Sequence, residues 1–103
     1  MTGEMIELGG NIKLSGFKEL EPAMLVVVKK MVGNYAKKMT DHSTSFKELN
    51  LHLKEVHKTE KNSKYEIQAR LSADKLYNSE VVDFNLFFAI DKALSKIMNE
   101  IKR

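Results

Sequence analysis

Residues 46–71, FKELNLHLKEVHKTEKNSKYEIQARL, contain the pattern that decides the fold. Every second residue from Leu49 to Leu53 is apolar, and every second residue from Tyr65 to Leu71 is apolar or aromatic. Alternation with a period of two predicts strands that bury one face and expose the other to water. Because a polar stretch at residues 58–63 separates the two strands, we expect a turn there and an antiparallel pair.

Two further segments extend this sheet. After a short turn at Ala73–Asp74, residues 76–82 predict another strand and complete an antiparallel meander. Upstream, residues 5–13 predict a first strand, in which Gly9–Gly10 is expected to form a bulge or a bend. The sheet is therefore expected to have four strands.

Two amphipathic segments predict helices. Pro22 suits the first turn of one helix, where its missing N–H costs no hydrogen bond, and Asn85 is a good N-cap for the other. Apolar residues recur at spacings of three and four in both segments, which is typical of a helix with one buried stripe. The expected stripes are Met24, Val28, Met31, Tyr35 and Met39 in the first helix, and Leu86, Ile90, Ala93, Leu94, Ile97 and Ile101 in the second.

The predicted order of elements is β-α-β-β-β-α, in a single domain over residues 1–103. One face of the sheet is polar throughout, so both helices are expected to pack on the other face. The sequence thus predicts a two-layer α+β fold with a four-stranded sheet. A chain of 103 residues, 43% hydrophobic and 30% charged, suits one globular domain with one core.

The composition excludes several classes of protein. The chain has no cysteine, which excludes disulfides, thiolate metal sites and a cysteine nucleophile. No stretch approaches the roughly 20 apolar residues of a membrane span. The first residues carry Glu4 and Glu7 and no basic residue, unlike a signal peptide. We therefore expect a cytoplasmic protein without a membrane partner.

The residues that carry most enzyme chemistry are poorly placed for it. The three histidines are His42, His52 and His57; the last two are five apart on or near a strand and so point to opposite faces, which excludes a shared metal ion. Phosphate loops, nucleophile elbows and paired acids at catalytic spacing are also absent from the sequence. We expect no enzyme activity, no catalytic residue, no metal, no cofactor and no small-molecule substrate. An active site assembled from distant residues stays open at this point.

Positive charge is concentrated on the two predicted helices. The net charge is +3, and residues 22–39 contain four lysines and no acid, while residues 85–103 also carry an excess of basic residues. Such helix faces predict a phosphate-binding surface, although a solvated lysine face that only maintains solubility gives the same pattern. The predicted RNA-binding residues are Lys29, Lys30, Lys37, Lys38, Lys92, Lys96 and Arg103.

Residues 80–101, EVVDFNLFFAIDKALSKIMNEI, resemble the last strand and last helix of the ribosome hibernation-promoting factor and ribosome-associated inhibitor family, also known as sigma-54 modulation proteins. In that family an acid-[Met/Leu]-[Tyr/Phe]-x-Ala-Ile-Asp segment opens the last helix. Residues 85–91 correspond to it, with Asn85 in place of the acid. The predicted order of elements also matches the family over nearly the whole chain.

The resemblance implies a protein that occupies the mRNA and tRNA channel of the small ribosomal subunit and inhibits translation in stressed or resting cells. Its partners would be the small subunit and its rRNA. The family's basic contacts carry over by position to Lys29, Lys30, Lys37, Lys92 and Lys96. Longer family members have a C-terminal dimerisation domain, which this sequence does not contain, and formation of a homo-oligomer is left open.

Two alternatives remain from the sequence. One is a general RNA-binding module with the layout of a double-stranded-RNA-binding domain; such domains open their last helix with a lysine-rich run, where this chain has FFAIDKALSK. The other is a small protein-interaction domain that uses Phe88, Val26 and a sheet edge.

Overall fold

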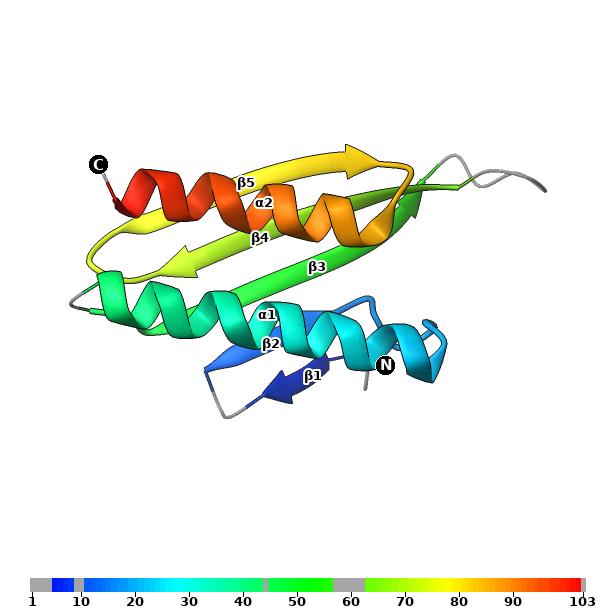
Figure 1. Ribbon diagram of the computed structural model, residues 1–103, viewed down its shortest axis with the longest axis horizontal. Coiled ribbons are helices and arrows are strands. Elements are labelled where there is room, and N and C mark those ends of the chain that lie inside the picture. Colours follow the sequence, from blue (N-terminus) through cyan, green and yellow to red (C-terminus); the bar gives the residue numbers. More distant parts are fainter. Residues whose placement is uncertain (1–4, 9–10, 44, 57–62, 103) are drawn as a thin grey trace.

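The computed structural model describes residues 5–8, 11–43, 45–56 and 63–102, and these form two layers (Figure 1). A five-stranded sheet forms one layer, and two helices lie side by side on one of its faces. The two-layer α+β class and the placement of both helices on one face are as predicted. In chain order the elements are β1 (Met5–Leu8), β2 (Ile12–Ser15), α1 (Pro22–His42), β3 (Glu48–Val56), β4 (Lys64–Ser72), β5 (Leu76–Asp83) and α2 (Leu86–Ile101).

The sheet is mixed, and its strands follow chain order from β1 to β5. Strands β3, β4 and β5 form the antiparallel meander that the alternating sequence predicted, with Leu51 opposite Ala69 and Ala69 opposite Ser79. Only β2 and β3 pair in parallel, because α1 carries the chain from one end of the sheet back to the other.

The first strand differs from its prediction. Residues on either side of Gly9–Gly10 form two short strands that pair antiparallel, with Ile6 opposite Leu14 and Leu8 opposite Ile12, so the sheet has five strands instead of four. The two glycines, where we expected a bulge or bend, lie outside the described residues. Alternation does not encode direction: these apolar residues share one face whether the chain continues straight or turns back.

The core lies between the sheet and the helices. On β3 and β4 the apolar members of the alternating pattern are buried from Leu49 to Leu53 and from Ile67 to Leu71. Helix α2 buries its stripe as predicted, with Ile101 partly buried. Neither helix in this part of the chain is long and apolar enough to cross a membrane.

The buried stripe of α1 is displaced from its prediction. Val28 and Met39 are buried as expected, but Met24, Met31 and Tyr35 are only partly buried. Val32 and Ala36 are buried in their place. The helix meets two neighbours, the sheet below and α2 beside it, so its apolar surface is divided between a buried line and a half-exposed line next to α2.

Candidate nucleic-acid interface

The four α1 lysines all reach solvent. Lys29, Lys30, Lys37 and Lys38 are exposed because they lie on sides of the helix that face away from its buried line. Pro22 occupies the first turn, and no acidic residue stands in that turn. The helix therefore carries its positive charge along its length, with Asp41 and His42 following in its last turn.

The start of α2 is fixed by hydrogen bonds at the end of β5. The side chain of Asn85 accepts a hydrogen bond from the backbone N–H of Phe88 at 3.0 Å, which is the N-cap that the sequence predicted. Asp83 in turn accepts a hydrogen bond from the backbone N–H of Asn85 at 2.9 Å. Ser79 donates to the Ala93 carbonyl at 2.7 Å and ties the middle of α2 to β5.

Lys92 is the one predicted site residue with an ion pair in the part of the chain that the structure describes. Its Nζ lies 3.1 Å from Asp83 Oδ2, while 61% of its side chain remains exposed. The hydrogen bond from the Asn85 N–H, followed by the contact with Lys92, holds the pKa of Asp83 below its ordinary value. Lys92 is thus accessible, but part of its charge is already balanced.

The seam between the helices is polar and partly acidic. The Tyr35 hydroxyl donates to Asp91 Oδ1 at 2.7 Å and shares a second hydrogen bond with Ser95 Oγ at 2.8 Å. Burial raises the pKa of Tyr35, so this hydroxyl keeps its proton at neutral pH. Lys38 Nζ lies 5.3 Å from the centre of the Tyr35 ring, within range of a cation–π contact.

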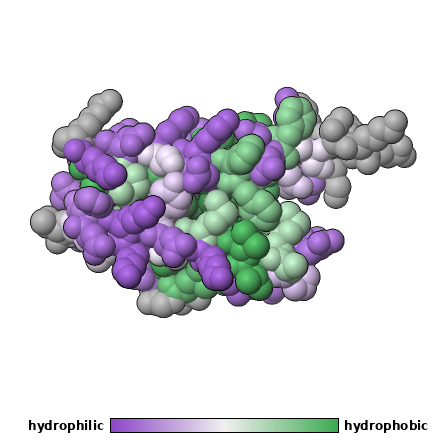
Figure 2. Space-filling model, in the orientation of Figure 1, coloured by the Kyte–Doolittle hydropathy of each residue, from purple (hydrophilic) through white to green (hydrophobic). Residues whose placement is uncertain are grey.

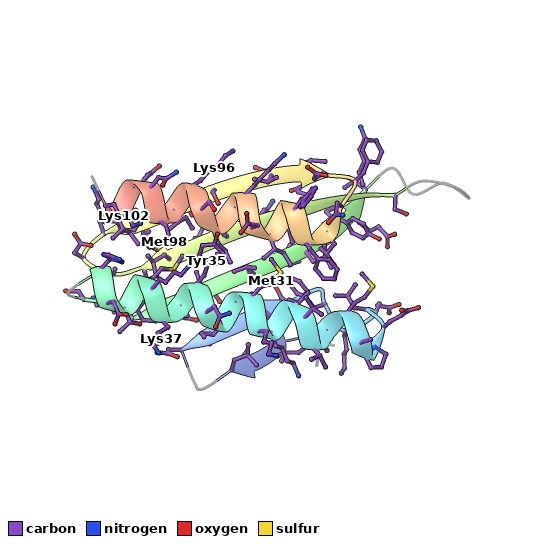
Figure 3. The ribbon with its side chains drawn as sticks, viewed as in Figure 1. Met31, Tyr35, Lys37, Lys96, Met98 and Lys102 are labelled. Atoms are coloured by element: carbon purple, nitrogen blue, oxygen red, sulfur yellow. The ribbon has the colours of Figure 1, made fainter. Side chains whose placement is uncertain are left out.

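The predicted lysines do not gather in one row. Figure 3 shows Lys37 and Lys96 on opposite outer sides of the helical layer, with Tyr35 and Met98 between them. Lys37 and Lys96 therefore mark two separate charged flanks, while Lys38 lies nearer the seam, over the Tyr35 ring. Arg103, the last predicted site residue, lies outside the described residues.

Most of these lysines have no acidic partner. Among the described residues, no acid lies within ion-pair distance of Lys29, Lys30, Lys37 or Lys96. Lys102 directly follows α2, is exposed, and also has no acid within ion-pair distance among the described residues. It was not among the predicted site residues. Its place among the basic residues at the end of the predicted helix was the signal available in the sequence.

The helical side also exposes apolar surface. Figure 2 shows a hydrophilic zone over one end of the helical layer and a hydrophobic zone toward the end where both helices begin. Val26 and Phe88 are each 61% exposed, and Val27 is 43% exposed. The helical spacing between Phe88 and the buried Ile90 puts Phe88 on the side of α2 away from the core, which agrees with its exposure.

The open face of the sheet holds contacts that the sequence did not suggest. Ser15 Oγ and His52 Nδ1 lie 2.8 Å apart, and Arg70 Nε donates to Asn78 Oδ1 at 3.2 Å. These groups line a shallow hollow of about 410 Å³. Ser15 and His52 are 37 residues apart in sequence, and strand register brings both hydrogen-bonded pairs together. Within the described residues, no three His, Asp or Glu side chains are grouped to hold a metal ion.

Comparison with known proteins does not assign the chain to a family. No protein-family model matches the chain, and no curated protein matches it. The resemblance to ribosome hibernation factors therefore stays a prediction from the sequence.

Proposed function

We propose that this protein binds rRNA of the small ribosomal subunit through the lysine-bearing sides of α1 and α2, and that it inhibits translation in the cytoplasm as a hibernation factor. The observation that carries the proposal is the set of exposed helix lysines without acidic partners in the described chain. Ammonium groups that are not used within the protein are available to phosphates.

The distribution of the remaining charge supports the same surface. Lys13 and Glu48 pair at 2.9 Å on the open face of the sheet, so their charges balance there. Glu66 and Glu80 also lie on that face, and their hydrogen bond raises the pKa of Glu80. The open face also carries Lys54 and Arg70, so acidic and basic side chains are mixed there. Helix α1 has four lysines and one acid, so an excess of positive charge that attracts a polyanion lies on the helical side.

The choice of rRNA over other polyanions rests on the resemblance at residues 80–101. Asn85 caps α2 as an acid does in the family segment, so this departure leaves the local structure intact. Lysines act as flexible point charges and suit contact with a phosphate backbone more than recognition of base edges. This agrees with binding in a channel walled by folded rRNA.

Co-sedimentation with purified small subunits tests the proposal. We expect the protein to travel with small subunits at low salt and to stay at the top of the gradient at high salt, because counterion release drives the binding. The variant Lys30→Glu/Lys37→Glu should lose binding at low salt, since two exposed charges are reversed.

A matched control keeps the change in net charge and moves it off the helices. Lys54→Glu/Lys75→Glu alters one lysine on β3 and one in the turn before β5, both exposed, and should bind as the unmodified protein does. If the unmodified protein fails to sediment with small subunits at any salt concentration, or if both double variants bind equally well, the proposal is wrong.

A protein-interaction domain is the second candidate, favoured by the exposed side chains of Val26 and Phe88. Apolar side chains with this exposure are common where another protein docks. A stoichiometric protein complex that survives ribonuclease treatment of a cell extract would favour this candidate over the ribosomal one.

A further inference from the structure

Two exposed phenyl rings frame the start of α2. Phe84 precedes the cap residue Asn85, and Phe88 lies in the first turn of the helix; each residue is 61% exposed. The hydrogen bonds of Asp83 and Asn85 fix the backbone between the two rings. The rings are therefore displayed on an ordered part of the chain, at the end where both helices begin.

A lysine accompanies each ring. Lys64 Nζ, at the start of β4, lies 5.1 Å from the centre of the Phe84 ring. Lys92 follows Phe88 by four residues, which places the two side chains on neighbouring turns of one helix side. The contact with Asp83 holds the Lys92 ammonium near this end of the helix. Phe84, Phe88, Lys64 and Lys92 together are called the aromatic platform below.

We infer that the aromatic platform binds unpaired nucleotides of RNA, with bases stacked on Phe84 and Phe88 and the adjoining phosphates on Lys64 and Lys92. This inference rests on the proposed function and specifies the form of RNA that the surface takes. Aromatic rings interleaved with cations are the common solution for single-stranded nucleic acid, because every base has a π face and every nucleotide a charge.

The exposed rings and their lysines favour an unpaired RNA strand over an RNA duplex and over an apolar protein surface. In an A-form duplex the bases are stacked on one another, so an exposed ring has no base face to contact. An apolar protein surface would have to strip water from two ammonium groups to cover the rings. A single strand meets the rings and the ammonium groups at once.

The test compares an unstructured 12-nucleotide RNA with a 12-base-pair RNA duplex, using fluorescence anisotropy at one salt concentration. The variant Phe84→Leu/Phe88→Leu keeps two apolar side chains and removes the aromatic faces. We expect it to bind the single strand roughly 5-fold to 100-fold more weakly for each ring lost, and the duplex as before. A 2-aminopurine base in the strand should be quenched by the unmodified protein and not by this variant.

The outcomes separate this inference from the proposed function. If the unmodified protein binds both RNAs equally and the leucine variant is unchanged, the platform is not a stacking site, while small-subunit binding still stands on its own test. If Phe84→Ala/Phe88→Ala loses small-subunit binding and the leucine variant keeps it, the rings make a general apolar contact and the inference is wrong. If the unmodified protein binds neither RNA, the inference is wrong, and the sedimentation test alone decides small-subunit binding.

Discussion

Gly16 is a single residue on which the entry to the first helix depends. Its φ is 81°, in the region that side-chain-bearing residues rarely adopt, and a Cβ there would collide with the backbone carbonyl of Leu53. The turn that it makes delivers Phe17, which is fully buried, into the core. Both the backbone conformation and the close approach to β3 therefore require glycine.

We expect Gly16→Ala to lower the free energy of unfolding by about 2–3 kcal/mol, from backbone strain together with the collision. Gly33→Ala is the matched control, since nothing lies within 4 Å of a Cβ at that position of α1. It should stabilise the protein by about 0.5–1 kcal/mol, because alanine is the better helix former. Thermal unfolding followed by circular dichroism measures both. Equal effects of the two substitutions would contradict this account.

The residue patterns predicted which side chains are buried or exposed better than they predicted which side chains pair with each other. The helical period predicted the stripe of α2 that the structure buries between Leu86 and Ile97. The same period gave no sign that Lys92 would meet Asp83, because that contact forms between the end of β5 and the second turn of α2. Helical spacing contains no information about such a meeting of two elements. The hydrogen bond between Ser15 and His52 could not be predicted from the sequence for the same reason.

Among the elements, those with a continuous period were predicted best. The alternation in β3 and β4 and the cap of α2 correspond closely to the structure. The strand expected at residues 5–13 failed because the pattern is the same for one long strand and for a hairpin. The buried stripe of α1 was predicted in the wrong place because the sequence of one helix does not indicate on which side its second neighbour, α2, packs.

Asp83, at the junction between β5 and α2, is expected to make the stability of the fold decrease at acid pH. The pKa of Asp83 is lowered by the hydrogen bond from Asn85 and then by Lys92. Since the folded-state pKa lies below the unfolded one, this carboxylate stabilises the fold above its unfolded value near 4, and the contribution disappears as pH falls through the folded value. Asp83→Asn removes the charge and keeps an oxygen that can accept from Asn85.

We therefore expect Asp83→Asn to have a lower melting temperature than the unmodified protein at pH 7, and we expect this difference to shrink as the pH falls below about 4. Thermal melts of both proteins across this pH range measure the difference in melting temperature. The other carboxyl groups titrate in both proteins, so their effect on this difference largely cancels. A difference that stays constant from pH 7 to pH 3 would show that Asp83 does not act through its charge.

The helical layer carries lysines on both of its outer flanks, with an acidic residue in the seam between the helices. Lys37 and Lys96 lie on opposite outer sides, and Asp91 lies between the helices, bonded to Tyr35 (Figure 3). A single straight duplex lying in the seam would bring its phosphates against Asp91. An RNA surface that surrounds the helical layer, as a channel does, would reach both flanks.

Salt dependence distinguishes these two geometries. If about six lysines each neutralise a phosphate, the logarithm of the affinity for small subunits should fall with the logarithm of salt concentration at a slope of roughly −4 to −5. Lys30→Gln/Lys37→Gln on α1 and Lys96→Gln/Lys102→Gln at α2 should each make that slope shallower by roughly 1.5, because each removes two phosphate contacts. Sedimentation binding at several salt concentrations gives the three slopes. A change confined to one of the variants would mean that RNA covers one flank only, and the channel geometry would then be wrong for this protein.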